Sequence, residues 1–164
     1  MDTTPYTFKK HHGFQAVGIK WEGTFAEAEA GGIRAVQEEV QRRLLEIKHV
    51  TDPHTLLGLS YHTDKDRFTH YAVVEVEQAE QVPESMTSVT VPEREYLTYS
   101  HPKGDSVQQS YGNLFAWMER NGYRHDQRDL THFEKYPMSQ DPYTTKPEFT
   151  ILIPVTAESD AGNG

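Results

Sequence analysis

Two apolar stretches rich in β-branched residues decide the fold: Ala72-Val73-Val74-Glu75-Val76 and, 79 residues later, Ile151-Leu152-Ile153-Pro154-Val155. Each has the composition of a strand that is buried in a sheet. A similar offset brings the turn Glu22-Gly23-Thr24 close to Lys103-Gly104-Asp105, and each turn precedes a segment with helical periodicity. The sequence therefore predicts one order of elements that occurs twice, although the two halves share few identical residues.

The first helical segment opens at Thr24-Phe25-Ala26-Glu27, whose spacing matches a capping box. Gly31-Gly32 interrupts the segment, because each glycine costs about 1 kcal/mol relative to alanine inside a helix. The helix therefore begins either at Thr24 or only after Gly32. Its apolar residues recur at intervals of three and four positions: Ile33, Val36, Val40, Leu44 and Ile47.

The second helical segment begins at Asp105 or Ser106 and ends at Asn121-Gly122, since glycine accepts the left-handed conformation that often closes a helix. One apolar stripe follows it: Val107, Tyr111, Leu114, Phe115 and Met118. The remaining apolar segments have strand patterns, at residues 14–21, 55–61, 69–76, 89–99, 130–136 and 149–155.

This order predicts an α+β fold of two βαββ modules, residues 7–77 and 88–155, inside a single domain that spans residues 1–155. A half of about 75 residues buries too little surface to be stable alone. We therefore expect the halves to join sheet to sheet, with a cleft at their seam. Residues 156–164 are small and polar, and we expect a disordered tail there.

The charge of the chain bears on its partners. Sixteen Lys and Arg against 25 Asp and Glu give a net charge of −9, and an acidic surface repels the phosphate backbones of nucleic acids. No apolar run approaches the roughly 20 residues of a membrane span, and the N-terminus lacks the apolar core of a signal peptide. We therefore expect a cytoplasmic protein that binds neither nucleic acid nor membrane, and the absence of cysteine agrees with that location.

Common catalytic and cofactor motifs are missing from the sequence. Glu29-Ala30-Gly31-Gly32-Ile33 lacks the Lys and Ser/Thr of a phosphate-binding loop, and there is neither a Rossmann fingerprint nor a Gly-x-Ser-x-Gly turn. Nine histidines are present, but none of them has the spacing of metal ligands. The sequence therefore predicts no metal and no cofactor.

Three stretches carry a resemblance to a known family: residues 114–123 (LFAWMERNGY), 133–136 (FEKY) and 149–155 (FTILIPV). Their order and spacing resemble the GyrI-like small-molecule-binding domain, which also forms the effector-binding half of some AraC-type and MerR-type bacterial regulators. The resemblance covers roughly residues 7–155. It implies two βαββ modules with antiparallel sheets related by a pseudo-twofold axis, two main helices and a central ligand cleft.

The resemblance also implies functions. Family members bind lipophilic, often cationic compounds among aromatic side chains around an acidic residue. Some free-standing members hydrolyse cyclopropane-bearing alkylating toxins, and the namesake branch inhibits DNA gyrase. The helix-turn-helix domain that precedes the ligand domain of the regulators is missing here, so we expect a free-standing member without direct DNA binding.

Glu134 is the first candidate site residue. Side chains alternate along a strand, so Leu130, His132, Glu134 and Tyr136 are expected on one partly buried face. A buried carboxylate needs a partner or a raised pKa, which suits a ligand for cations or a general base. The alternative is a surface strand on which Glu134 pairs with a cross-strand Lys or Arg. The resemblance favours the site, because the family's acidic pocket residue lies in this strand.

Aromatic residues are the second group of candidates, since aromatic faces attract cations and stack on planar molecules. For each of them, packing in the core is the alternative. We predict that five of them line the ligand site together with Glu134: Trp21, Tyr99, Tyr111, Trp117 and Tyr136.

Three functions remain open from the sequence. The first is binding of an apolar, aromatic and cationic small molecule, for drug binding or for sensing with an unknown protein partner. The second is hydrolysis of cyclopropane-bearing toxins, with Glu134 as general base and a tyrosine hydroxyl, Tyr99 or Tyr136, donating a hydrogen bond to the developing oxyanion. The third is inhibition of DNA gyrase through an acidic surface that mimics DNA.

Overall fold

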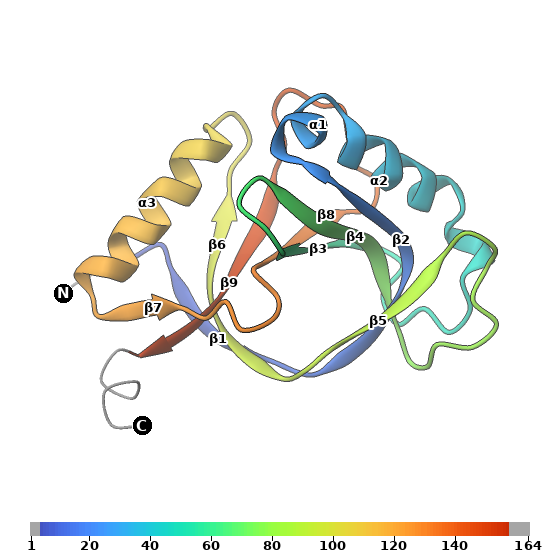
Figure 1. The fold of residues 1–164 in the computed structure, drawn as a ribbon, viewed down its shortest axis with the longest axis horizontal. Helices are drawn as coiled ribbons and strands as arrows, with labels where there is room; N and C mark the ends of the chain where they lie inside the picture. Colours follow the sequence, from blue (N-terminus) through green and yellow to red (C-terminus); the bar gives the residue numbers. More distant parts are fainter. Residues whose placement is uncertain (1–3, 158–164) are drawn as a thin grey trace.

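The computed structural model describes residues 4–157, which form one large antiparallel sheet with its helices on one face (Figure 1). The first half of the chain contains β1 (Thr7–His11), β2 (Phe14–Thr24), α1 (Phe25–Glu29), α2 (Gly32–Arg42), the 3₁₀ turn η1 (Leu44–Glu46), β3 (Thr55–His62) and β4 (Arg67–Val76). The second half contains β5 (Thr87–Val91), β6 (Arg94–His101), α3 (Val107–Arg120), β7 (Tyr123–His125), β8 (His132–Pro137) and β9 (Phe149–Ala157).

The strand order of the sheet is the same on both sides of its middle. The order is β1-β6-β9-β8-β3-β4-β2-β5, with β7 paired to β9 beyond this path. The strands of each βαββ module follow one order outward from the central β8–β3 pair. This order is β3, β4 and β2 in the first module, and β8, β9 and β6 in the second. The 79-residue offset matches β4 to β9, the last strands of the two modules. The α+β prediction of two βαββ modules with antiparallel pairing is therefore confirmed, while the rotation axis between the halves stays a prediction.

The two short outer strands exchange partners between the halves. β1 precedes the first βαββ module but pairs with β6 of the second module, and β5 precedes the second module but pairs with β2 of the first. Each half thus completes the other's sheet edge, which ties the halves together more tightly than the β8–β3 pair could alone.

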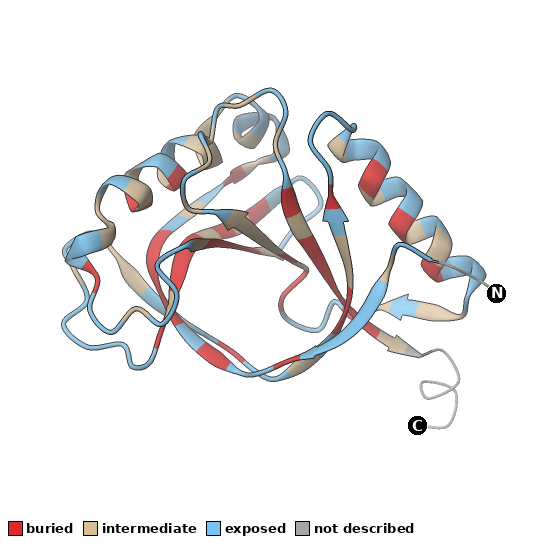
Figure 2. Ribbon diagram, turned by 180° about the vertical axis from the view of Figure 1, so that it is seen from behind, coloured by how far each residue is buried: buried red, intermediate tan, exposed pale blue. Residues whose placement is uncertain are grey.

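The helices cover different halves of the same sheet face. Val40 of α2 and Ile47 pack on β2, β3 and β4. Leu114 and Met118 of α3 pack on β6 and β9. The opposite face curves round a separate core that includes Tyr96 and Phe133. Figure 2 shows the buried residues along the central strands and the exposed residues on the outer sides of the helices.

The helix boundaries follow the local sequence closely. Thr24 and Glu27 form the predicted capping box, and α1 begins directly after Thr24. Gly31 has a φ of 116°, a left-handed conformation that glycine adopts without strain, and it separates α1 from α2. The segment predicted as one helix with one of two starts is therefore two helices, one capped by Thr24 and one that begins at Gly32 itself. In the second half, Ser106 caps α3, and Gly122, with a φ of 77°, follows its end.

Two sequence predictions need correction. The strand expected at residues 89–99 is two strands, β5 and β6, because Pro92 has no amide hydrogen for a ladder and the chain turns there to pair with a different neighbour. The expected tail at 156–164 begins inside β9, where Thr156 pairs with Arg124. The rest of that tail lies outside the described residues.

Candidate functional site

Glu134 lies at the seam of the two halves. It is on β8, directly opposite Gly58 of β3. Its carboxylate accepts a hydrogen bond from the hydroxyl of Tyr136, at 2.7 Å on Oε1, and a second from the hydroxyl of Tyr111 on Oε2. One donor is two residues along the same strand, and the other comes from α3. The surface alternative, with Glu134 in a cross-strand ion pair, does not apply.

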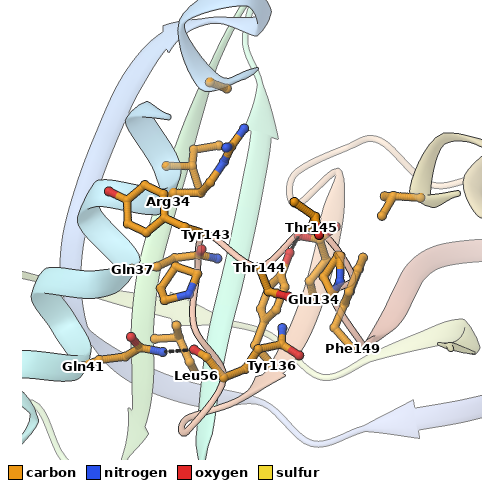
Figure 3. Close-up of a pocket in the computed structure, with 16 residues that line it drawn as sticks. Arg34, Gln37, Gln41, Leu56, Glu134, Tyr136, Tyr143, Thr144, Thr145 and Phe149 are labelled. Carbon is orange, nitrogen blue, oxygen red and sulfur yellow. Dashed lines mark hydrogen bonds between the residues drawn. The ribbon is translucent and has the colours of Figure 1, made fainter. Parts of the chain in front are cut away.

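A cavity of about 540 Å³ lies on the α2 side of this carboxylate. Its floor contains Glu134, Tyr136 and Leu56, and Figure 3 shows these side chains facing those of α2 and of the loop before β9. The size suits a drug-sized ligand. Besides these three residues, the lining consists of Ala28, Ile33, Arg34, Gln37, Gln41, Val107, Gln140, Pro142, Tyr143, Thr144, Thr145, Pro147 and Phe149.

Burial controls the ionisation of the site. Removal from water raises the pKa of Glu134, and the hydrogen bonds from Tyr111 and Tyr136 partly oppose that shift because they stabilise the charged form. Burial and the neighbouring carboxylate raise the pKa values of both tyrosines well above their usual range, so both hydroxyls keep their protons. The site therefore consists of two fixed donors around one carboxylate whose charge responds to its surroundings.

Gly58 makes room for this arrangement. A Cβ atom at Gly58 would lie 3.0 Å from Cε1 of His70 and 3.6 Å from Oε1 of Glu134. His70 is buried, its Nδ1 lies 2.9 Å from Oγ of Ser60, and burial lowers its pKa to about 4, so it is neutral at pH 7. Glycine at this position allows the imidazole and the carboxylate to approach the same point from opposite sides.

The loop between β8 and β9 covers the cavity and is attached to α2. Nε2 of Gln41 donates hydrogen bonds to the backbone carbonyls of Met138, at 3.0 Å, and Gln140, at 2.8 Å. This loop contributes Tyr143, Thr144 and Thr145 to the lining of the cavity.

Three of the six predicted site residues come together: Tyr111, Glu134 and Tyr136 form one hydrogen-bonded cluster. Tyr136 and Glu134 line the cavity, whereas Tyr111 closes the carboxylate from the α3 side. His132 packs against Tyr111, with ring centroids 5.2 Å apart, and makes no hydrogen bond to Glu134 within residues 4–157. Leu130 precedes β8 and packs in the core on the other sheet face, so it does not share the face of Glu134 as predicted.

The structure does not bring Trp21, Tyr99 or Trp117 to this cavity. Trp21 is on β2, three strands from β8, and its ring lies 5.4 Å from that of Phe68. Tyr99 shares the sheet face of Glu134, but β6 is two strands from β8, which is about 10 Å in a sheet. Tyr99 and Trp117 instead both pack against Tyr6, at ring-centroid distances of 5.5 and 5.3 Å.

Sequence reasoning missed the wall that α2 and the β8–β9 loop provide. Arg34, Gln37 and Gln41 are spaced by three and four residues, so they form one polar stripe beside the apolar stripe of the helix. Gln37 is 6% exposed, an unusual burial for a polar side chain on a surface helix. The stripe is visible in the sequence, but nothing local indicates that a loop 100 residues later covers it.

The described part of the chain contains no group of three or more His, Asp or Glu side chains placed to hold a metal ion. No described helix is long and apolar enough to cross a membrane.

The family model of the GyrI-like small molecule binding domain matches residues 4–156, nearly the whole chain. The chain belongs to the GyrI-like family. No curated protein sequence matches it significantly. The GyrI-like chain is therefore identified by the family model and by its fold rather than by a near relative.

Solved structures share this fold at low sequence identity. SAV2435 bound to tetraphenylphosphonium has a TM-score of 0.70 and 16% identity, with 93% of this chain and 94% of that chain covered. The C-terminal domain of EcmrR has a TM-score of 0.70 and 15% identity, with 93% and 97% covered. A hydrolase from Listeria innocua has a TM-score of 0.55 and 13% identity, with 92% and 91% covered. As a member of the GyrI-like family, the chain is a small-molecule-binding domain.

Proposed function

We propose that this domain binds lipophilic aromatic cations in the cavity between α2 and β8, with Glu134 as the counter-charge. The observation that carries the proposal is the carboxylate of Glu134, held by the hydroxyls of Tyr111 and Tyr136 at the floor of a cavity of about 540 Å³. A carboxylate removed from water gains more from a nearby cation than a solvated one does.

The walls of the cavity suit the apolar part of such a ligand. Leu56, Ile33 and Phe149 offer apolar surface, and Tyr136 and Tyr143 offer aromatic faces. The free-energy cost of transferring a delocalised organic cation from water is small. Apolar walls can therefore hold its rings while one buried carboxylate balances its charge. That a structural neighbour was solved with tetraphenylphosphonium supports this choice of ligand class.

The proposal couples binding to the ionisation of Glu134. Burial raises the pKa of Glu134, so part of the population carries a neutral carboxyl when the pH is near that pKa. A bound cation favours the charged form. Affinity for a permanent cation should therefore increase as the pH rises through the pKa of Glu134 and stay constant above it.

The test is a calorimetric titration of tetraphenylphosphonium at pH 8 into the wild type, Glu134→Gln and a control, Glu119→Gln. Glu119 is exposed on α3, away from the cavity. We expect micromolar or weaker binding by the wild type and by the control, and a loss of about tenfold or more in Glu134→Gln. Equal affinity for all three proteins would remove Glu134 from the site, and no binding to the wild type would overturn the proposal.

Hydrolysis is the second candidate, because a carboxylate and a tyrosine hydroxyl are 2.7 Å apart at the floor of one cavity. Glu134 would take a proton from water as the water oxygen attacks a cyclopropane carbon. The C–C bond of the ring then breaks toward a conjugated carbonyl, whose oxygen accepts a hydrogen bond from Tyr136. Mass spectrometry of a cyclopropane-bearing alkylator would detect the water adduct. Glu134→Gln should lower the rate about 10²- to 10⁴-fold, and a wild-type rate equal to that of buffer would exclude the reaction.

A further inference from the structure

Arg34 gives the cavity a second formal charge. Of the 16 residues that line the cavity, only Glu134 and Arg34 carry charged side chains. Glu134 comes from β8 at the floor, whereas Arg34 comes from the first turn of α2, and Figure 3 shows the two on different sides of the space. The cavity is therefore polarised, with a negative group at one end and a positive group on the facing helix.

The charge of Arg34 is not cancelled by an acidic neighbour. Its Nη2 donates a 2.6 Å hydrogen bond to the backbone carbonyl of Glu29, at the end of α1, and this bond anchors the guanidinium. Within the described residues, Arg34 makes no ion pair, unlike Arg42 at the end of α2 and Arg43 directly after it, which both pair with Glu39. A guanidinium has five donors, and one accounts for the contact with Glu29.

An unpaired guanidinium in the wall works against a ligand that is only a cation. It repels the positive charge that Glu134 attracts, while its free donors favour a carboxylate or a comparable anion. Gln37, Thr144 and Thr145 add polar groups to the lining. Besides its apolar walls, the lining thus offers polar groups at more than one point.

We propose that the preferred ligands of this cavity are aromatic zwitterions, with the cationic centre at Glu134 and an acidic group at Arg34. The inference rests on the proposed function and narrows its ligand class. It makes Arg34 the residue that distinguishes zwitterions from simple lipophilic cations. Removal of the guanidinium should weaken binding of the first class and leave that of the second unchanged or stronger.

Two fluorescent dyes that differ only at one group provide the test. Rhodamine 110 carries a free carboxylate beside its cationic ring system, and rhodamine 123 is its methyl ester. Fluorescence-anisotropy titrations at pH 8 compare both dyes, and a calorimetric titration adds tetraphenylphosphonium. The proteins are the wild type, Arg34→Gln, Arg34→Lys and a control, Arg42→Gln, whose side chain is exposed on α2 outside the cavity.

We expect the wild type and Arg42→Gln to bind rhodamine 110 about threefold or more tightly than rhodamine 123. Arg34→Gln should lose this preference without weaker binding of rhodamine 123 or tetraphenylphosphonium, and Arg34→Lys should retain part of it because the charge remains. Equal binding of both dyes by the wild type, or a preference that persists in Arg34→Gln, would overturn this inference alone. Absence of binding by both dyes and by tetraphenylphosphonium would overturn the proposed function as well.

Discussion

The two halves of the sheet have the same strand order, yet the side chains that they place at the seam differ. Gly58 on β3 of the first half lies opposite Glu134 on β8 of the second half. On the second half's side, α3 places the hydroxyl of Tyr111 on the carboxylate. On the first half's side, α2 stands back and leaves a cavity lined by Gln37 and Gln41. One side of the seam is filled and the other is open.

This difference shows how a fold of two similar halves can carry one candidate site at its seam. A second glutamate at Gly58 would place two buried carboxylates beside each other, which strongly disfavours the charge of both. Glycine instead admits the neutral ring of His70, so one carboxylate remains with its two tyrosine donors. The asymmetry of two residues across one strand pair therefore leaves the candidate site with one carboxylate, and the cavity lies on the α2 side of it.

The largest effect is expected from filling the glycine side of the seam. Gly58→Val places branched carbon atoms against His70, whose Cε1 already lies 3.0 Å from the Cβ position. Overpacking of this kind should lower the free energy of unfolding by about 3 kcal/mol or more, measured by urea denaturation. Gly112→Ala is the control, because Gly112 is exposed in α3 with open space around its Cβ position, and it should be neutral or stabilising by up to about 1 kcal/mol. Wild-type stability of Gly58→Val would show that the two sides of the seam are not constrained as described.

The filled side is tested by Tyr111→Phe. The substitution removes one of the two donors to the buried carboxylate, so the free energy of unfolding at pH 8 should fall by about 1–3 kcal/mol. The loss should shrink at low pH, where the neutral carboxyl needs the donor less. Tyr123→Phe, on a partly exposed ring that stacks on Trp117, should change stability little. Equal effects of both substitutions at pH 8 would mean that the bond to Glu134 contributes nothing specific.

A third prediction uses the pH dependence of stability. The folded-state pKa of Glu134 is raised above its unfolded value, so the folded state binds the proton more tightly, and Glu134 favours folding most below the unfolded pKa. That contribution is lost as the pH rises from the unfolded pKa through the folded pKa. Relative to the wild type, Glu134→Gln should therefore become progressively more stable from pH 4 to pH 8 in urea denaturation. A difference that is constant with pH, or that changes in the opposite direction, would contradict a raised pKa of Glu134 in the folded protein.

The smallest effect is expected from the contact between α2 and the β8–β9 loop, which form the wall of the cavity. Gln41→Ala removes both hydrogen bonds that attach the β8–β9 loop to α2. We expect a loss of about 1 kcal/mol in global stability and faster amide hydrogen exchange in residues 138–148, with the strands unaffected. Unchanged exchange in that loop would mean that its position over the cavity does not depend on Gln41.

Local sequence signals predicted the repeat, the carboxylate and a cleft at the seam, but not the residues of α2 and of the β8–β9 loop that form the wall of the cavity. The capping box at Thr24, the serine cap at Ser106 and the offset between β4 and β9 depend on neighbouring residues or on composition, and the structure confirms them. The contact of Glu134 with Tyr136 follows from their spacing of two on a strand.

The remaining features depend on contacts between distant parts of the chain. The exchange of β1 and β5 between halves, the distance of Tyr99 from Glu134 and the attachment of the β8–β9 loop to Gln41 are set by strand order and by packing. A single sequence contains periodicity, but it does not state which strand lies beside which. Aromatic residues such as Trp117 pack in cores as well as in pockets, so their number did not locate the site.

The central claim is that a ligand enters on the α2 side of the seam, and methyl NMR tests it most directly. Tetraphenylphosphonium is titrated into protein with labelled Ile, Leu and Met methyl groups. Ile33 and Leu56 line the cavity, whereas Leu114 and Met118 are on the buried face of α3. The account predicts saturable shifts of the Ile33 and Leu56 methyl signals with little change at Leu114 and Met118. Shifts centred on Leu114 and Met118 would place the ligand on the α3 side and contradict it.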